Sequence, residues 1–170
     1  MDPKTIAYQF GLTANVLERN VGDLSHDDSL IGPEKGGSCL NWVVGHITRT
    51  RNSALGMLTK KHPFPMTDFD AYDDRTGVPF TKENALSLAE LMRRFRAMQE
   101  PLVDAVKALP AEALAAPASF SPSGNPKETV GSLMVSFAFH ESYHVGQTGI
   151  LRRVAGREGV IKPPRETALR

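Results

Sequence analysis

The stretch VGSLMVSFAFHESYHVGQTGIL, residues 130–151, contains a single formally charged side chain, Glu141. Steps of three and four residues return to the same side of an α-helix. One such series places apolar side chains and two histidines on a common face: Leu133, Phe137, His140, His144, Gln147 and Leu151. A neighbouring series is also apolar: Phe139, Tyr143, Ile150 and Val154. A helix that is apolar nearly all round is buried on several sides, so we expect this stretch to be a central helix.

His140 and His144 are predicted to lie one turn apart on the inward face of this helix. Imidazoles at positions i and i+4 leave the same side of a helix and can bind one metal ion. A third ligand is needed, and His46 is the best candidate because it is the one other histidine expected within a helix, beside its core face. His26 and His62 fall in expected loops, where we expect them to be solvated.

Three further segments show helical periodicity, and each is bounded by recognisable start or stop signals. Asp2 before Pro3 is an N-cap followed by proline at the first helical position. Asn125 before Pro126 repeats that pattern at the start of the last helix. The expected helices are Asp2 to about Leu24, Ser38 to about Lys60, Thr81 to Pro110, and Asn125 to Gly156, with one more turn at Ala111 to Ala115.

Four long amphipathic segments without a convincing alternating strand pattern predict an all-α fold, and more narrowly an antiparallel four-helix bundle. The long connection between the second and third helices, His62 to Phe80, permits a crossover in place of simple up-and-down order. A chain of 170 residues suits one domain, 1–170, with residues 156–170 as a loosely packed tail.

The charge balance excludes some classes of partner. With 20 basic and 19 acidic residues, the chain has a formal net charge of +1 and no basic patch expected to bind nucleic acid or a membrane surface. Residues 130–151 are long enough to span a bilayer, but their histidines, glutamate and hydroxyls argue against it. The single cysteine, Cys39, allows no internal disulfide, and no signal peptide is expected at the N-terminus. We therefore expect a cytoplasmic protein.

The histidines also admit two other interpretations. In the first, they are core residues whose ring nitrogens hydrogen-bond to hydroxyls such as those of Tyr143, Ser136 or Thr148. The letters HESYH, residues 140–144, also match the H-E-x-x-H pattern of zinc proteases, in which the glutamate is the general base. The protease interpretation is the weaker one, because no histidine follows His144 and no strand is expected that would hold a peptide.

Two motifs resemble the DinB/YfiT-like family of metalloenzymes. LNWVVGHITRTRN, residues 40–52, has a tryptophan followed by a Gly-His pair, and HESYHVGQTGILRR, residues 140–153, has two histidines followed by Gly-Gln. The matching positions are Trp42, Gly45, His46, His140, His144, Gly146 and Gln147. The resemblance implies a four-helix bundle that holds a divalent metal with His46, His140 and His144, often in a homodimer. Some relatives use bacillithiol, mycothiol or glutathione in S-transfer or isomerisation.

The leading hypothesis is therefore a metal-dependent transferase or hydrolase with a small-molecule substrate, a bound divalent metal ion and, in one version, a low-molecular-weight thiol. Zinc and nickel are the preferred metals, and iron, manganese and cobalt also suit three imidazoles. The candidate catalytic residues are Gln147, Tyr143 and Glu141. Gln147 would orient a ligand or, equally, form an interhelical hydrogen bond. The alternative hypothesis is a non-catalytic metal-binding or dimerisation module.

Overall fold

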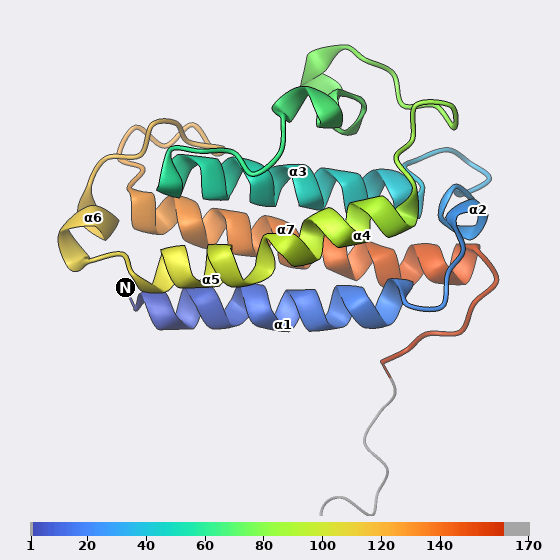
Figure 1. Cartoon of the computed structure of the whole chain (residues 1–170), viewed down its shortest axis with the longest axis horizontal. Helices are drawn as coiled ribbons and strands as arrows, with labels where there is room; N and C mark the ends of the chain where they lie inside the picture. Colours follow the sequence, from blue (N-terminus) through green and yellow to red (C-terminus); the bar gives the residue numbers. More distant parts are fainter. Residues whose placement is uncertain (1, 162–170) are drawn as a thin grey trace, which may run out of the picture.

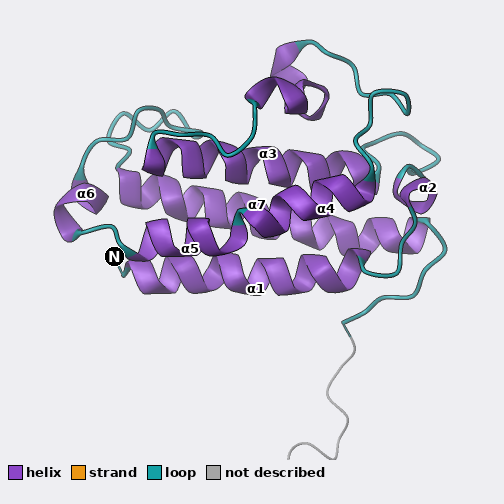
Figure 2. Ribbon diagram, viewed as in Figure 1, coloured by secondary structure: helices purple, strands orange, loops and turns teal. Residues whose placement is uncertain are grey.

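The computed structural model describes residues 2–161, and every regular element in this range is helical (Figure 1, Figure 2). An isolated antiparallel bridge between Pro117 and Thr129 is the extent of β pairing in the described part of the chain. The α-helices are α1 Pro3–Val21, α2 His26–Ser29, α3 Leu40–Thr59, α4 Leu88–Ala97, α5 Gln99–Lys107, α6 Ala111–Ala115 and α7 Val130–Val154. The 3-10 helices are η1 Met66–Tyr72 and η2 Asp74–Thr76. The predicted all-α fold is confirmed for these residues.

Four helical segments lie side by side: α1, α3, α7 and the consecutive pair α4–α5 (Figure 1). Helices α1 and α7 run in the same direction, because Gln9 bonds Ser142 and, farther along both helices, Asn20 bonds Thr148. Helices α3 and α4–α5 also share a direction. The connection between them, residues 60–87, therefore carries the chain back along the length of α3, as a crossover does (Figure 1).

The third expected helix differs from the observed one at both its start and its middle. It begins at Leu88, capped by Ser87, because the side chains of Thr81 and Asn84 hydrogen-bond each other's backbone in a local turn. It breaks at Met98, between α4 and α5. Pro101 explains the break, since it has no N–H to donate to the carbonyl of residue 97 and its ring clashes with that carbonyl.

Helix α7 begins at Val130 and not at Asn125, because Thr129 and Ser132 form a reciprocal capping box. The N-cap of α3 is Cys39 and not Ser38, and its side chain makes no capping hydrogen bond. Within the expected loop after α1, the short helix α2 has a capping box of its own from Ser25 and Asp28. The ends of α3 and α7 agree with expectation within two residues.

The side chains that face inward from the four segments form the hydrophobic core. Two contiguous clusters fill it, and each takes residues from α1, α3, α4–α5 and α7. The expectation that α7 is buried on several sides is wrong for one of its stripes. Phe139, Tyr143 and Ile150 are 67%, 59% and 63% exposed, because α1 and α3 cover only the opposite sides of the helix.

None of the described helices combines the length and apolar character needed to cross a membrane. The predicted tail lies partly outside the described residues. Up to residue 161 it makes defined contacts, since Arg157 pairs with Asp28 and the Glu158 carbonyl accepts a hydrogen bond from Arg152.

Candidate metal centre

The three histidines selected from the sequence come together between α3 and α7. His46 comes from α3, and His140 and His144 come from consecutive turns of α7. One ring nitrogen of each lies within 4.8 Å of the others, and the Nε2 atoms of His46 and His140 are 3.0 Å apart. All three side chains are half-buried. Three imidazoles converging on one point form a donor set that can hold a divalent metal ion.

The residues around His46 fix its orientation. Trp42, one turn earlier on α3, stacks on the imidazole with ring centroids 4.8 Å apart and planes 10° apart. His46 Nδ1 lies 2.8 Å from the Tyr72 carbonyl oxygen. A carbonyl only accepts hydrogen bonds, so Nδ1 carries the proton and Nε2 presents its lone pair to the other histidines. A hydrogen bond of this kind orients metal-binding imidazoles and raises their basicity.

Gly45 explains how the Tyr72 carbonyl reaches His46. A Cβ at position 45 would lie 2.1 Å from Tyr72 Cδ1, so only glycine lets the tyrosine ring lie flat on α3. The buried Tyr72 hydroxyl donates to Asn41 and accepts from the Leu86 backbone N–H. Tyr72 thereby joins the middle and the last part of the crossover connection to the start of α3. The connection supplies a positioning group, the Tyr72 carbonyl, that the sequence did not reveal.

His144 is positioned by a neighbour on its own helix. Its Nδ1 lies 2.7 Å from Gln147 Oε1, so Nδ1 donates and Nε2 is left with its lone pair. Gln147, a candidate catalytic residue, is thus engaged in holding His144. His140 Nδ1 is buried and has no hydrogen-bond partner among the described residues. His140 Nε2 lies 3.0 Å from the unprotonated Nε2 of His46, so without an ion it carries the proton and donates to His46. A bound metal ion would replace that proton, and His140 Nε2 would then act as a ligand atom.

The surroundings keep all three imidazoles neutral. Burial, and after it the neighbouring His144 and His46, lower the pKa of His140 to about 4. Burial is also the main cause that lowers the pKa of His46, partly opposed by the hydrogen bond to the Tyr72 carbonyl. It lowers the pKa of His144 as well, against the opposing hydrogen bond to Gln147. Neutral imidazole is the form that binds metal, so protons do not compete for the site at neutral pH.

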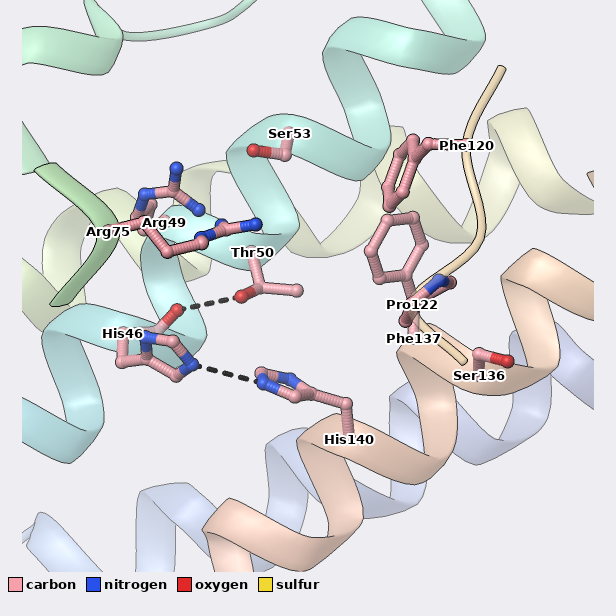
Figure 3. Close-up of a pocket in the computed structure, with 10 residues that line it drawn as sticks. All are labelled: His46, Arg49, Thr50, Ser53, Arg75, Phe120, Pro122, Ser136, Phe137 and His140. Atoms are coloured by element: carbon pink, nitrogen blue, oxygen red, sulfur yellow. Dashed lines mark hydrogen bonds between the residues drawn. The ribbon is translucent and has the colours of Figure 1, made fainter. Parts of the chain in front are cut away.

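A cavity of about 450 Å³ opens directly onto His46 and His140. It is lined by residues of α3, η2, α7 and the loop that precedes α7: His46, Arg49, Thr50, Ser53, Arg75, Phe120, Pro122, Ser136, Phe137 and His140. Figure 3 shows Arg49 and Arg75 on one side and the Phe120 and Phe137 rings on the other, with the two histidines below. This volume lies within the range of small-molecule sites, about 300–1,000 Å³.

Glu141 points away from the histidines and into the core. Its carboxylate accepts hydrogen bonds from Arg51 Nε at 2.6 Å and Arg51 Nη2 at 2.7 Å, and also from Thr13. Arg51 also contacts Gln99 and lies over the Phe95 ring, 3.8 Å from its centroid. Helical periodicity placed Arg51 at the flank of its helix, near solvent, but its side chain is buried and only 1% exposed. A carboxylate held in this way is not available as the general base of a protease.

Tyr143 borders the site from outside. Its ring meets His144 edge-on with centroids 5.2 Å apart, but 59% of the residue is exposed and it does not line the cavity. Sequence reasoning missed Tyr72, Arg75 and Phe120, which lie in irregular connections. Of these, only Tyr72 could have been suspected from the sequence. Gly45 within the second helix indicates that a bulky side chain packs closely there, and Tyr72 is that side chain.

Comparison with known protein families identifies the chain's relationship. Residues 9–148 match the sequence model of the DinB superfamily, a range that contains all three histidines of the cluster. No protein of curated function matches the chain.

Proposed function

The chain belongs to the DinB superfamily, and on that premise we propose that it is a metal-dependent enzyme whose divalent ion is held by His46, His140 and His144. The observation that carries this proposal is the convergence of three half-buried ring nitrogens within 4.8 Å. Two of the three rings have their other nitrogen committed to an acceptor, which directs the remaining lone pair toward the cluster.

The donor set also bears on the metal. Three neutral nitrogen ligands suit zinc or nickel best, and they also suit iron(II), cobalt or manganese. The geometry of the site and the availability of each metal decide which ion is bound. When bound, such an ion supplies a Lewis acid and lowers the pKa of a coordinated water or thiol. We therefore propose a transfer or hydrolysis reaction. In it, the protein's own residues position the ligands and shape the cavity for a small substrate.

The cavity favours an enzyme over a structural metal module. A structural site is usually closed by four protein ligands, whereas catalytic sites keep a position open. Within residues 2–161, the potential metal-binding group consists of these three histidines alone. Two of them form part of the wall of the 450 Å³ cavity, so a small molecule in it would reach the ion. The zinc protease is the weakest alternative, because Arg51 and Thr13 occupy Glu141.

We further propose that the fold is a four-helix bundle with a crossover and that it forms a homodimer through the exposed face of α7. Phe139, Tyr143 and Ile150 present three large apolar side chains on that face. Gly146 lies among them, and a Cβ there would meet no atom within 4 Å. A helical glycine costs about 1 kcal/mol relative to alanine. No contact within the described chain explains it, whereas close approach of a second helix does.

The test is titration of metal-free protein with Co²⁺, followed by visible absorption. We expect one ion per chain, with a spectrum that changes when a small thiol or anion is added, since an open position admits an exogenous ligand. A His26→Ala/His62→Ala double variant is the matched control and should behave as wild type. A saturating spectrum that no added ligand alters would indicate a closed structural site and would contradict the proposed enzyme.

A further inference from the structure

We propose that the cavity beside His46 and His140 binds a small organic anion with an apolar arm. The anionic group lies at Arg49 and Arg75, and the arm lies between Phe120 and Phe137. This inference deepens the proposed function, on which it rests for the ion's charge and for the reaction. The arrangement of charge and apolar surface in the cavity wall is independent of any metal.

The charged side chains that line the cavity are both arginines. They share one carboxylate: Arg49 pairs with Asp73, and Arg75 donates to the same group from Nε at 2.8 Å and from Nη2 at 3.1 Å. The hydrogen bond from Arg75 is the main cause that lowers the pKa of Asp73, so this carboxylate is ionised at neutral pH. Asp70 also acts on Arg49, but from outside the cavity wall. Among the side chains in direct contact, one carboxylate balances one of two guanidinium groups, which leaves one positive charge that a ligand can meet.

The two arginines differ in how freely they can meet a ligand. Arg49 belongs to α3 and its side chain is 16% exposed, whereas Arg75 belongs to η2 and its side chain is 76% exposed. Asp70 and Asp74 belong to the same connection, but neither lines the cavity. Arg75 can therefore exchange part of its contact with Asp73 for a ligand oxygen while Arg49 keeps Asp73 in place.

The opposite wall is apolar. The rings of Phe120 and Phe137 lie 6.1 Å apart between centroids, and Figure 3 shows them facing the arginines across the cavity. Phe120 is 49% exposed although it lies in the wall of a cavity, so the fold itself does not bury this ring. An aliphatic or aromatic arm would cover it and gain from the removal of apolar surface from water.

The proposed ion would add to this preference. Three neutral imidazoles leave its double charge uncompensated, and no carboxylate lines the described cavity. An anionic ligand would complete the charge balance, whereas a cationic one would be repelled by the arginines and the ion alike.

The experiment compares two probes of nearly equal shape, 4-phenylbutyrate and its neutral amide, by calorimetric titration of metal-free and zinc-loaded protein. We expect the acid to bind about tenfold more tightly than the amide even without metal, because one strong charge-assisted contact has that value. Arg75→Gln should reduce the affinity for the acid about three- to fivefold and leave the amide unchanged, in keeping with a partly exposed ion pair. Phe120→Ala should weaken both probes.

Arg93→Gln is the matched control. It removes a guanidinium that is 60% exposed and paired with Glu90 on α4, and it should not change the affinity for either probe. Two results with metal-free protein would overturn the inference. One is equal affinity for acid and amide, and the other is an acid preference that survives Arg75→Gln combined with Arg49→Gln in folded protein. If the protein binds the acid but takes up no zinc on titration, the inference is supported and the proposed enzyme is refuted. Failure of the inference can therefore be told from failure of the proposed function.

Discussion

Replacing Gly45 with alanine tests whether the crossover connection positions the metal site. The added Cβ would lie 2.1, 2.3 and 2.6 Å from Cδ1, Cε1 and Cγ of Tyr72. Carbon atoms in contact normally stay about 3.5–4.0 Å apart, so the ring must move by more than about 1 Å. Its hydroxyl would leave Asn41 and the Leu86 backbone N–H, and its carbonyl would move relative to His46 Nδ1.

Two opposing effects set the magnitude for Gly45→Ala. Forcing extra volume into a packed core costs about 1–3 kcal/mol. Alanine in the middle of a helix recovers about 1 kcal/mol relative to glycine. Packing and helix propensity together should therefore lower the free energy of unfolding by no more than about 2 kcal/mol, and the two hydrogen bonds lost by the Tyr72 hydroxyl should lower it by about 1–3 kcal/mol more. Loss of a hydrogen-bond partner of a metal-binding histidine typically lowers metal affinity about 10- to 100-fold, and we expect a fall in this range.

The assay is competition for Zn²⁺ against a chromophoric chelator, with unfolding by urea measured in parallel on metal-free protein. Trp42 is the one tryptophan of the chain and stacks on His46, so its fluorescence reports on both experiments. Gly11→Ala in α1 is the control, because a Cβ there meets no atom within 4 Å and should stabilise the protein without altering metal affinity. Wild-type zinc affinity in Gly45→Ala would refute the positioning role of Tyr72.

Three further predictions address other parts of the molecule. Glu141→Gln should destabilise the protein by about 3–5 kcal/mol in urea titrations, because it leaves the buried Arg51 without its charge partner; wild-type stability would contradict this. Metal-free protein should lose stability as pH falls from 6.5 toward about 4, since below 6.5 the unfolded chain takes up a proton at His140 that the native chain excludes; an unchanged slope in folded His140→Gln would contradict that assignment. Light scattering should give a dimer mass for wild type and a monomer mass for Phe139→Glu, whereas the same mass for wild type and variant would refute the proposed interface.

The helical segments were predictable from sequence because their apolar residues recur with helical spacing. The cluster was predictable for the same reason: His140 and His144 share a face with Leu133 and Phe137, and His46 lies beside the core face of α3. The start of α7 was not predictable from the sequence. Both Asn125 and Thr129 are residue types that cap helices, and only the contacts of the loop show that Thr129 is the cap.

The positions of Glu141 and Tyr143 show what periodicity leaves undetermined. Both belong to a helix with little charge, and nothing in the spacing of α7 states which sides its neighbours cover. Because α3 and α1 both pack alongside α7, Glu141 meets Arg51 from α3 and Thr13 from α1 in the core. Among residues 2–161, no element covers the opposite side, and Tyr143 is exposed there. The contributions of Tyr72 and Arg75 depend on the path of a crossover, which has no periodic pattern.

The central claim is that His46, His140 and His144 together bind one divalent ion. The most direct measurement is the metal content of purified protein by mass spectrometry, before and after incubation with Zn²⁺ or Ni²⁺ and removal of free metal. A His46→Ala/His140→Ala/His144→Ala variant, shown to be folded by circular dichroism, is measured beside it. We predict one ion per wild-type chain and none in the variant. Wild-type protein that takes up no metal, or a folded variant that takes up as much, would contradict the claim.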